Sequence, residues 1–224
     1  MLPLPDDVPA DVAAVVGCAV ITGVGAAIET LRVEAGSRGC VIGCGGVGVN
    51  AIQGARVRGA AEIVAIDPSG ERRDAASRFG ATGSLDPGDD DSVAELVARA
   101  PRQGFDWSIV TVGATSAMRL GVDAVRPGGT MVAVGLTPEN DPTPIDMLAV
   151  VTYEKTIRGS AYGTLSPLVL VPRILELYRR GLLLLDELVT HRLPLESIDE
   201  GFDLSRRAQG MRPVLAITND GRFG

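Results

Sequence analysis

The stretch GCVIGCGGVGVNAIQGARVRGAAEIVAID, residues 39–67, decides the fold. Its short apolar run at 40–43 predicts a buried strand, and the small-residue segment 47–59 predicts a helix that packs closely against that strand. A second apolar run at 62–66 predicts the next strand and ends at Asp67. A strand, a helix and a strand in this order form a parallel pair joined by a crossover helix.

The same alternation continues along the chain. Further strands are expected at 82–85, 107–112, 130–136, around 156–161 and at 213–217. Helices are expected at 70–78, before the breaker cluster RPGG at 126–129, from Pro172 to Gly181, and after Ser197, which has capping-box spacing to Glu200. We therefore expect an α/β fold with a Rossmann-type doubly wound parallel sheet.

The segment GCGGVG at 43–48 has the G-x-G-x-x-G spacing at a strand-to-helix turn. In such a turn Gly43 permits the tight bend, Gly45 lets the backbone approach a pyrophosphate, and Gly48 lets helix and strand pack closely. The helix N-terminus offers backbone amides to the phosphates. Asp67 follows Gly48 by 19 residues (67 − 48), at the strand end where a carboxylate can accept hydrogen bonds from ribose hydroxyls. The pattern predicts a dinucleotide site.

The ribose acid also bears on which dinucleotide binds. Asp67 would repel a 2′-phosphate, which favours NAD over NADP, whereas Arg72 and Arg73 oppose that preference because a nearby arginine accommodates the phosphate. Two other interpretations stay open, a glycine-rich turn without a ligand and a methyltransferase nucleotide site. The third glycine and the acid favour the dinucleotide.

Composition and charge narrow the class of partner. The 224 residues carry a formal net charge of −7, which gives no basic excess for nucleic acid or an anionic membrane. Three cysteines are too few for a disulfide scaffold and favour a cytoplasmic setting. The uncharged stretch 12–28 approaches the length of a membrane span, but the acids before it and its glycines argue against a span or a signal peptide.

Five segments resemble the medium-chain zinc-dependent alcohol dehydrogenases, most closely their class III-like and related bacterial members. The segments are GCAVITGVGAA (17–27), VIGCGGVGVNAIQGAR (41–56), GAAEIVAIDPSGERRDAASRFGAT (59–82), KTIRGSAYG (155–163) and LVTHRLPLESIDEGFDL (188–204). The resemblance implies that residues 1–19 are the end of a catalytic domain, that 20–161 are the dinucleotide-binding domain, and that 162–224 return to the catalytic domain.

The same resemblance implies roles for individual residues. Cys18 stands where the family has the last protein ligand of its catalytic zinc, and Thr22 where a threonine packs beside the nicotinamide. The implied cofactor-binding residues are Gly43, Gly45, Gly46, Val47 and Gly48 on the pyrophosphate loop, Asp67 and Arg72 at the adenosine ribose, Val112 and Gly113 after the fourth strand, Val134, Ser160 and Tyr162 at the carboxamide, and Arg212 at the pyrophosphate.

Some of the family's catalytic parts have no counterpart in this sequence. The family's N-terminal domain supplies the other zinc ligands, the proton relay and much of the substrate pocket, and its structural zinc lobe has four clustered cysteines. Here His191 stands in a strand-like run, where we expect a packed or surface residue rather than a ligand. In the family, zinc polarises the substrate oxygen while NAD accepts the hydride.

We therefore expect the NAD-binding portion of a zinc-dependent dehydrogenase that acts on a primary alcohol or aldehyde. The alternatives are a non-catalytic dinucleotide-binding or dimerisation module and a zinc-free reductase of the same superfamily. The resemblance further implies a homodimer joined through the sheet edge near Val134 to Met147, where prolines and acids are typical of a protected edge.

Overall fold

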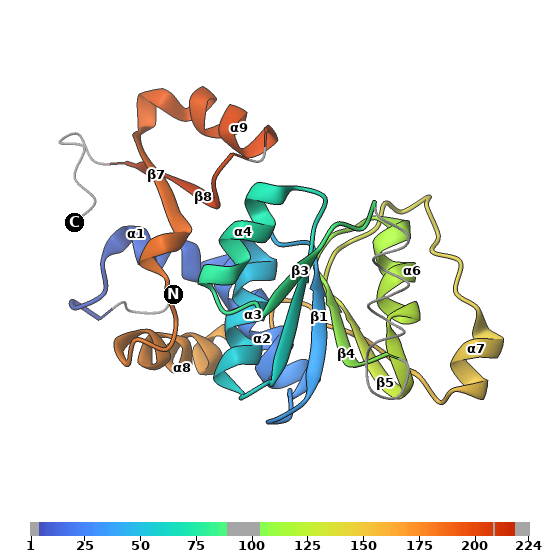
Figure 1. Cartoon of the computed structure of the whole chain (residues 1–224). Coiled ribbons are helices and arrows are strands. Elements are labelled where there is room, and N and C mark those ends of the chain that lie inside the picture. The colour runs from blue at the N-terminus through green and yellow to red at the C-terminus, as the bar shows by residue number, and fades with distance from the viewer. Residues whose placement is uncertain (1–4, 89–103, 208, 218–224) are drawn as a thin grey trace. The chain divides into compact units, whose positions relative to one another are not determined.

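The computed structural model describes residues 5–88, 104–207 and 209–217 (Figure 1). The chain divides into two units, which we number by the order in which they begin. Unit 1 comprises Met1–Ile21 and Ser166–Gly224, and unit 2 comprises Thr22–Leu165. The deciding stretch and the glycine loop therefore belong to unit 2.

Within the described residues, unit 2 is built on a six-stranded parallel sheet with the order β3-β2-β1-β4-β5-β6. The strands are β1 (Arg38–Ile42), β2 (Glu62–Ile66), β3 (Gly83–Leu85), β4 (Phe105–Val110), β5 (Val125–Ala133) and β6 (Thr156–Gly159). The chain runs outward from β1 to β3 and then returns to the other side of β1. This reversal confirms the expected doubly wound Rossmann-type sheet.

Helices cover both faces of that sheet. Helices α3 (Gly46–Val57) and α4 (Gly70–Arg78) lie on one face and α6 (Thr115–Asp123) lies on the other (Figure 1). The helical segments α2 (Ile21–Gly25) and η2 (Ala26–Leu31) pack on α3 at close range, because a Cβ at Gly23 would stand 2.2 Å from the Val47 oxygen. The short α7 (Met147–Thr152) precedes β6.

The core of unit 2 lies between these layers. Because the strands are covered on both faces, β1, β2 and β4 are almost continuously buried, as their largely apolar sequences predict. Lys155, the sole lysine of the chain, donates from Nζ to the carbonyl oxygens of Val122 at 2.8 Å and Asp123 at 3.5 Å. It thereby caps the C-terminal end of α6 with a positive charge.

The strands of unit 2 lie where the sequence predicts them, but β4 and β5 differ most from the predicted bounds. Strand β4 runs two residues earlier than expected. The cluster RPGG at 126–129 lies within β5 rather than ending a helix, because α6 has already ended at Asp123. Phe105 pairs with Val125 but Trp107 pairs with Thr130, so the cluster forms an irregular bulge in the strand. The ion pair of Arg126 Nε with Asp106 Oδ1, at 2.7 Å, holds this bulge against β4.

Unit 1 contains a pair of parallel strands and several helices. Its elements are α1 (Ala10–Val15), the π-helix η1 (Val16–Val20), α8 (Pro167–Arg179), η3 (Asp186–Leu188), β7 (Val189–Pro194), η4 (Leu195–Ser197), α9 (Ile198–Arg206) and β8 (Arg212–Ala216). The buried Asp11 accepts a hydrogen bond from Arg192 Nε at 2.7 Å, and this pair ties α1 to β7.

The helix expected to start at Pro172 starts instead at Pro167. Ser166 is its N-cap and accepts a hydrogen bond from the Leu168 amide at 3.3 Å, and Pro167 takes the first helical position that proline favours. Pro172 lies inside the helix, which its buried apolar face stabilises in spite of the missing amide. Gly181, with φ of +68°, follows the helix end as predicted.

The capping box expected at Ser197 is not formed. Ser197 is the N-cap of α9, but its side chain makes no capping hydrogen bond.

A separate feature of the described residues is the helical run Ala10–Leu31, which is long and apolar enough by composition to cross a membrane. Of its most apolar window, 67% is buried inside the protein, which is how the core helix of a folded domain behaves.

Candidate dinucleotide-binding site

The three glycines of the turn from β1 into α3, which we call the glycine loop (residues 43–48), meet three different constraints. Gly43 has φ of +89°, a conformation that side chains disfavour. A Cβ at Gly48 would lie 1.8 Å from the Gly43 oxygen, so the loop leaves no room for a side chain there. A Cβ at Gly45 would meet nothing within 4 Å. The space beside Gly45 is therefore open to a ligand.

The start of α3 leaves backbone donors directed out of the helix. Gly45 is the N-cap and has no side chain to bond them, and the Val49 amide makes the bond to the Gly45 oxygen at 3.0 Å. The amides of Gly46, Val47 and Gly48 precede that bond and form the N-terminal turn, where the helix dipole is positive. This arrangement suits the binding of an anionic group.

Asp67, at the end of β2, is tied to the loop by its own carboxylate. The side chain is almost fully buried, Oδ2 accepts the Cys44 amide at 2.8 Å, and Oδ1 accepts the Ser69 amide at 2.9 Å. Arg72 Nη1 lies 3.9 Å from Oδ2. An ionised carboxylate has about four acceptor positions, so these bonds leave capacity for ribose hydroxyls.

Cys44 sits beneath the loop as a neutral thiol. Burial, reinforced by the negative charge of Asp67, raises the pKa of the Cys44 thiol to about 12. Cys40 on β1 is also fully buried, and burial raises its pKa still further. Neither group is a nucleophile at neutral pH, because the thiolate is the reactive form.

The sequence prediction missed Thr111, which follows β4. Its Oγ1 donates to the Gly43 oxygen at 2.7 Å and its amide donates to the Ile42 oxygen at 2.9 Å, so it fixes the first turn of the glycine loop from the neighbouring strand. A lone threonine after an apolar run carries no distinctive signal. Gly113, a predicted cofactor contact, has no room for a side chain, because a Cβ there would stand 1.8 Å from the Leu136 oxygen in the loop after β5.

A pocket of about 650 Å³ opens at the carboxyl ends of the strands, on the side of α6. Apolar groups line most of it, and charged groups stand at a few positions, as in sites for a flat heteroaromatic ring. The described lining residues include Ile42, Ile66, Asp67, Arg72, Val112 and Leu120. Asp67 and Val112, both predicted cofactor contacts, thus share one pocket with Arg72.

The residues expected at the carboxamide gather at the carboxyl ends of β5 and β6. The Val134 amide donates to the Val110 oxygen at 2.9 Å. Ser160 is buried, and its hydroxyl lies 2.7 Å from Thr30 Oγ1 on η2. Tyr162 follows with φ of +53°, a left-handed conformation that few side chains adopt.

Among the described residues, no cluster of potential metal ligands surrounds the predicted zinc ligand Cys18. Cys18 is exposed on η1, and His191 is half-buried on β7, where Nδ1 lies 3.1 Å from Thr190 Oγ1. The described residues contain no group of three or more His, Cys, Asp or Glu that could hold a metal ion. Thr22 is half-buried on α2, and Arg212 on β8 has a buried Nε that finds no hydrogen-bond partner in the described part of the chain.

The chain is similar in sequence to known dehydrogenases. Residues 46–176 match the family model described as zinc-binding dehydrogenase. The chain is 34% identical over 219 residues to the class-3 alcohol dehydrogenase of Cereibacter sphaeroides and 36% identical over 219 residues to the NDMA-dependent alcohol dehydrogenase of Amycolatopsis methanolica. These matches cover 94% and 96% of this chain but 58% of each relative.

Solved structures show the same fold. The benzyl alcohol dehydrogenase of Acinetobacter calcoaceticus superimposes with a TM-score of 0.91 at 28% identity, over 97% of this chain and 59% of that chain. The chain thus spans somewhat more than half the length of the relatives it matches. Over that length it has the same fold as the solved structure. From the family match across the glycine-loop helix and the sheet that follows, the chain belongs to the zinc-binding dehydrogenase family.

Proposed function

We propose that the chain is the NAD-binding portion of a zinc-dependent alcohol dehydrogenase that transfers hydride between a primary alcohol or aldehyde and NAD. The observation that carries the proposal is the pairing of an open helix N-terminus at Gly45 with the buried carboxylate of Asp67 at the end of β2. That pairing offers amides to a pyrophosphate and an acceptor to a ribose. It supports a dinucleotide ligand over a glycine turn without one.

Each part of NAD then has residues that fit it. The amides of Gly46, Val47 and Gly48 bind the pyrophosphate, and Asp67 accepts the ribose hydroxyls beside Arg72. The family resemblance implies Arg212, in unit 1, as a further donor to the pyrophosphate. The pocket on the side of α6 takes the adenine, and the loop around Val112 and Gly113 borders it. The backbone at Val134, Ser160 and Tyr162 holds the carboxamide. When bound, NAD supplies the nicotinamide that accepts or returns the hydride.

In contrast to the dinucleotide site, the described residues do not form a zinc site by themselves. A catalytic zinc takes three protein ligands and keeps one open position. Cys18 can supply one ligand, and Thr22 would pack beside the nicotinamide. In this proposal residues 1–19 and 162–224 belong to the catalytic half, residues 20–161 bind the cofactor, and the protein works in the cytoplasm on a small alcohol or aldehyde.

Titration calorimetry with NAD and NADP tests the cofactor. We expect NAD to bind more tightly than NADP, and we expect Asp67→Asn to weaken NAD binding, because asparagine loses the charge and can accept only one of the two backbone amides, of Cys44 and Ser69, that Asp67 accepts. Absence of binding by either dinucleotide would overturn the proposal. Tighter binding of NADP by the unmodified chain would overturn the role given to Asp67.

A non-catalytic dinucleotide-binding or dimerisation module is the second candidate. It is favoured by one observation, that no group of three potential zinc ligands exists among the described residues. A turnover assay with zinc, NAD and simple primary alcohols tests the module, because hydride transfer by the chain would overturn a non-catalytic role. Binding of NAD without turnover fits both candidates, since the described residues do not form a zinc site by themselves.

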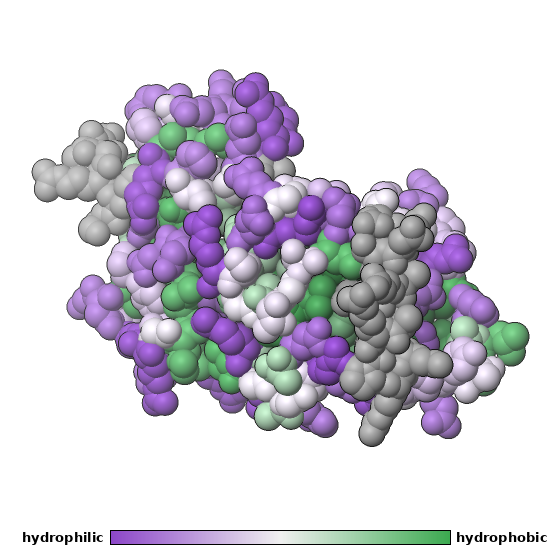
Figure 2. Space-filling model, viewed as in Figure 1, coloured by the Kyte–Doolittle hydropathy of each residue, from purple (hydrophilic) through white to green (hydrophobic). Residues whose placement is uncertain are grey.

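We also propose that two copies associate through the free edge of the sheet. In the described part of the chain the edge strand on the β5 side of the sheet is β6, and β3 is the other edge, whereas residues 134–146, where the edge was expected, lead from β5 to α7 without a strand. All four β6 residues are exposed, and α7 beside it exposes Leu148 at 76% and Val151 at 71%. Figure 2 shows this apolar surface at the α7 end of unit 2. An exposed edge with apolar neighbours suits pairing with a second copy.

A further inference from the structure

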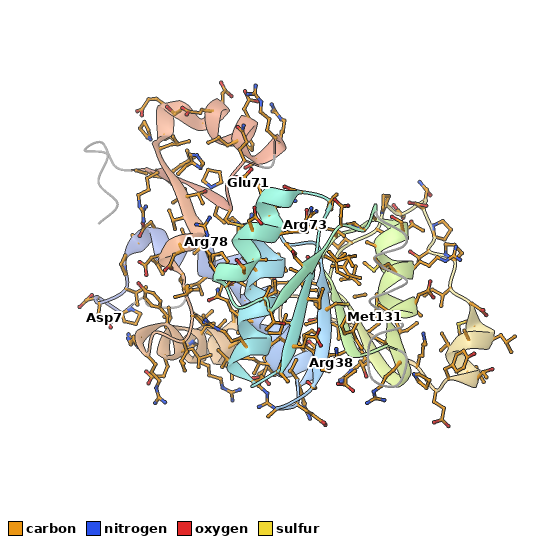
Figure 3. The ribbon with its side chains drawn as sticks, in the orientation of Figure 1. Asp7, Arg38, Glu71, Arg73, Arg78 and Met131 are labelled. Carbon is orange, nitrogen blue, oxygen red and sulfur yellow. The ribbon has the colours of Figure 1, made fainter. Side chains whose placement is uncertain are left out.

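Two consecutive arginines of α4, Arg72 and Arg73, stand near the ribose acid and make different contacts. Arg72 lines the pocket and lies 3.9 Å from Asp67 Oδ2. Arg73 is not among the described residues that line it. Its Nη1 donates instead to the Asp67 backbone oxygen at 2.5 Å and to Asp86 Oδ2 at 3.0 Å. Figure 3 shows Arg73 at the opposite end of the sheet from Arg38, where β1 begins.

Asp86, which follows β3, is held in a fixed orientation as it makes this ion pair. Its Oδ1 accepts the Gly88 amide at 2.9 Å, which leaves Oδ2 to face Arg73. The Arg73 side chain is 21% exposed and that of Asp86 is 41% exposed. The pair is therefore partly shielded from solvent on the side of the arginine. A shielded, doubly bonded guanidinium is less available to another anion than a free one.

The ion pair of Arg73 with Asp86 lies close to the ribose acid, so it affects which dinucleotide can bind. NADP differs from NAD by a phosphate on the adenosine ribose, and a site that accepts this phosphate needs a cation beside the ribose acid. The Arg73 guanidinium donates to the backbone oxygen of Asp67, so it stands next to the acid that would hold the ribose carrying that phosphate. Asp86 is the group that neutralises it.

We infer that Asp86 is a specificity-determining residue for the dinucleotide, because it withholds Arg73 from a 2′-phosphate. The inference rests on the proposed binding of NAD at this site. Asp86 is a positioning residue, since it acts through Arg73 and not on the ligand. Discrimination against NADP would then have two sources, the negative charge of Asp67 and the neutralisation of Arg73 by Asp86.

The variant Asp86→Asn tests this inference. Asparagine keeps the oxygen that accepts the Gly88 amide, so the turn is retained, but it loses the charge that holds Arg73. We expect the Kd for NADPH to fall about tenfold, the size of one charge-assisted contact to phosphate. The Kd for NADH should stay within about twofold, because the diphosphate and ribose contacts are unaltered. Fluorescence titration with both reduced dinucleotides measures the two constants.

Two further variants separate the proposed cause from others. In Asp86→Asn combined with Arg73→Gln the gain for NADPH should vanish, because the released cation is gone. Glu176→Gln also removes one negative charge, from an exposed ion pair with Arg180 on α8, and should leave the NADPH Kd unchanged. The gain in Asp86→Asn should shrink between 0.05 and 0.5 M salt, since screening weakens exposed charge contacts.

The outcomes that overturn the inference are distinct from those that overturn the proposed function. An unchanged NADPH Kd in Asp86→Asn, with NADH still bound, overturns the role of Asp86 alone. A gain that persists without Arg73, or that Glu176→Gln reproduces, does the same. Failure of both the unmodified chain and the variant to bind NADH overturns the dinucleotide site and this inference with it.

Discussion

Gly45 and Gly48 lie on the same loop, and their missing side chains serve different ends. At Gly48 the constraint is internal, because the Gly43 oxygen fills the place of a Cβ. At Gly45 the protein itself leaves the place empty, and φ of −73° is open to any residue. Packing therefore requires glycine at position 48, whereas the open space beside Gly45 is available to the dinucleotide that we propose.

The variants Gly48→Ala and Gly45→Ala should therefore differ. We expect Gly48→Ala to lower the free energy of unfolding by about 1–3 kcal/mol, as overpacking does. Gly45→Ala should cost no more than about 1 kcal/mol, the amount by which glycine exceeds alanine as an N-cap. Both should weaken NAD binding by at least about tenfold, because each alters the anion-binding turn. Urea unfolding and calorimetry measure the two effects, and equal losses of stability would contradict the assignment.

The thiols make a second prediction at this scale. The raised pKa of Cys44 keeps its proton in the folded state, whereas the unfolded chain releases that proton near the ordinary thiol pKa. Above pH 9 the unfolded state thus binds fewer protons, and the free energy of unfolding should fall as pH rises toward the folded pKa of about 12. Urea unfolding at pH 8 and pH 10 measures the fall.

Cys44→Ala provides the control for that pH dependence. The variant should lose some stability at pH 8 through the cavity it creates, but its decline between pH 8 and pH 10 should be shallower than that of the unmodified chain. Alkylation adds a second readout, because exposed Cys18 should react first, and buried Cys40 and Cys44 only after unfolding. An unchanged pH slope in Cys44→Ala would contradict the assignment.

The single residues that could be predicted from the sequence are those at which the backbone geometry requires a particular residue type. Gly43, Gly48 and Asp67 stand at fixed offsets from strand ends, and the structure brings them together as the spacing indicates. The contact of Thr111 with Gly43 could not be predicted, because it joins residues 68 positions apart and needs the register of β1 against β4. The division of labour between Arg72 and Arg73 depends on Asp86 in the same way.

At the scale of elements, the boundaries that sequence reasoning misplaced are those where packing overrides local preference. Pro172 should begin a helix by its chemistry, yet the apolar face of α8 extends on both sides of it and is buried. The RPGG cluster should end an element, yet β5 continues past it because Asp106 on β4 holds Arg126. Local propensity predicted the presence of these elements, and tertiary contacts set their ends.

The free edge at β6 gives a prediction at this scale. A charge on α7 should disrupt association through the edge, so Val151→Glu should sediment as a monomer where the unmodified chain sediments as a dimer. Leu168→Glu, on α8 in unit 1, is the matched control, because Leu168 is 66% exposed and Val151 is 71% exposed. Analytical ultracentrifugation measures the masses. Monomeric unmodified chain, or a dimer that Val151→Glu leaves intact, would contradict the proposed edge.

At the scale of the whole molecule, the sole tryptophan allows the unfolding of unit 2 to be measured separately from that of unit 1. Trp107, on β4 of unit 2, is buried, and its indole nitrogen donates to Ser37 Oγ at 2.9 Å. Gly39 on β1 lies under the ring, since a Cβ there would stand 2.0 Å from an indole carbon. Because this contact lies within the sheet, tryptophan fluorescence reports the unfolding of unit 2.

Bound NAD should therefore shift the fluorescence transition. At a concentration of about 100 times its Kd, a ligand that binds only the folded state adds about 2.7 kcal/mol of stability. For a chain of this size that gain raises the melting temperature by about 5–10 °C. Asp67→Asn should show a smaller shift at the same NAD concentration. Equal shifts in the two proteins would show that Asp67 does not contribute to NAD binding.

Lys155 has a practical consequence for labelling chemistry. Apart from the terminal amine, it is the sole primary amine in the chain, and burial lowers its pKa, which enlarges its reactive fraction near neutral pH. A reagent specific for amines would thus attach a dye or a surface linker at one internal position, next to the outermost strand. Acylation would also remove the charge that closes α6, so the yield of the modification would report how readily that end of the sheet opens.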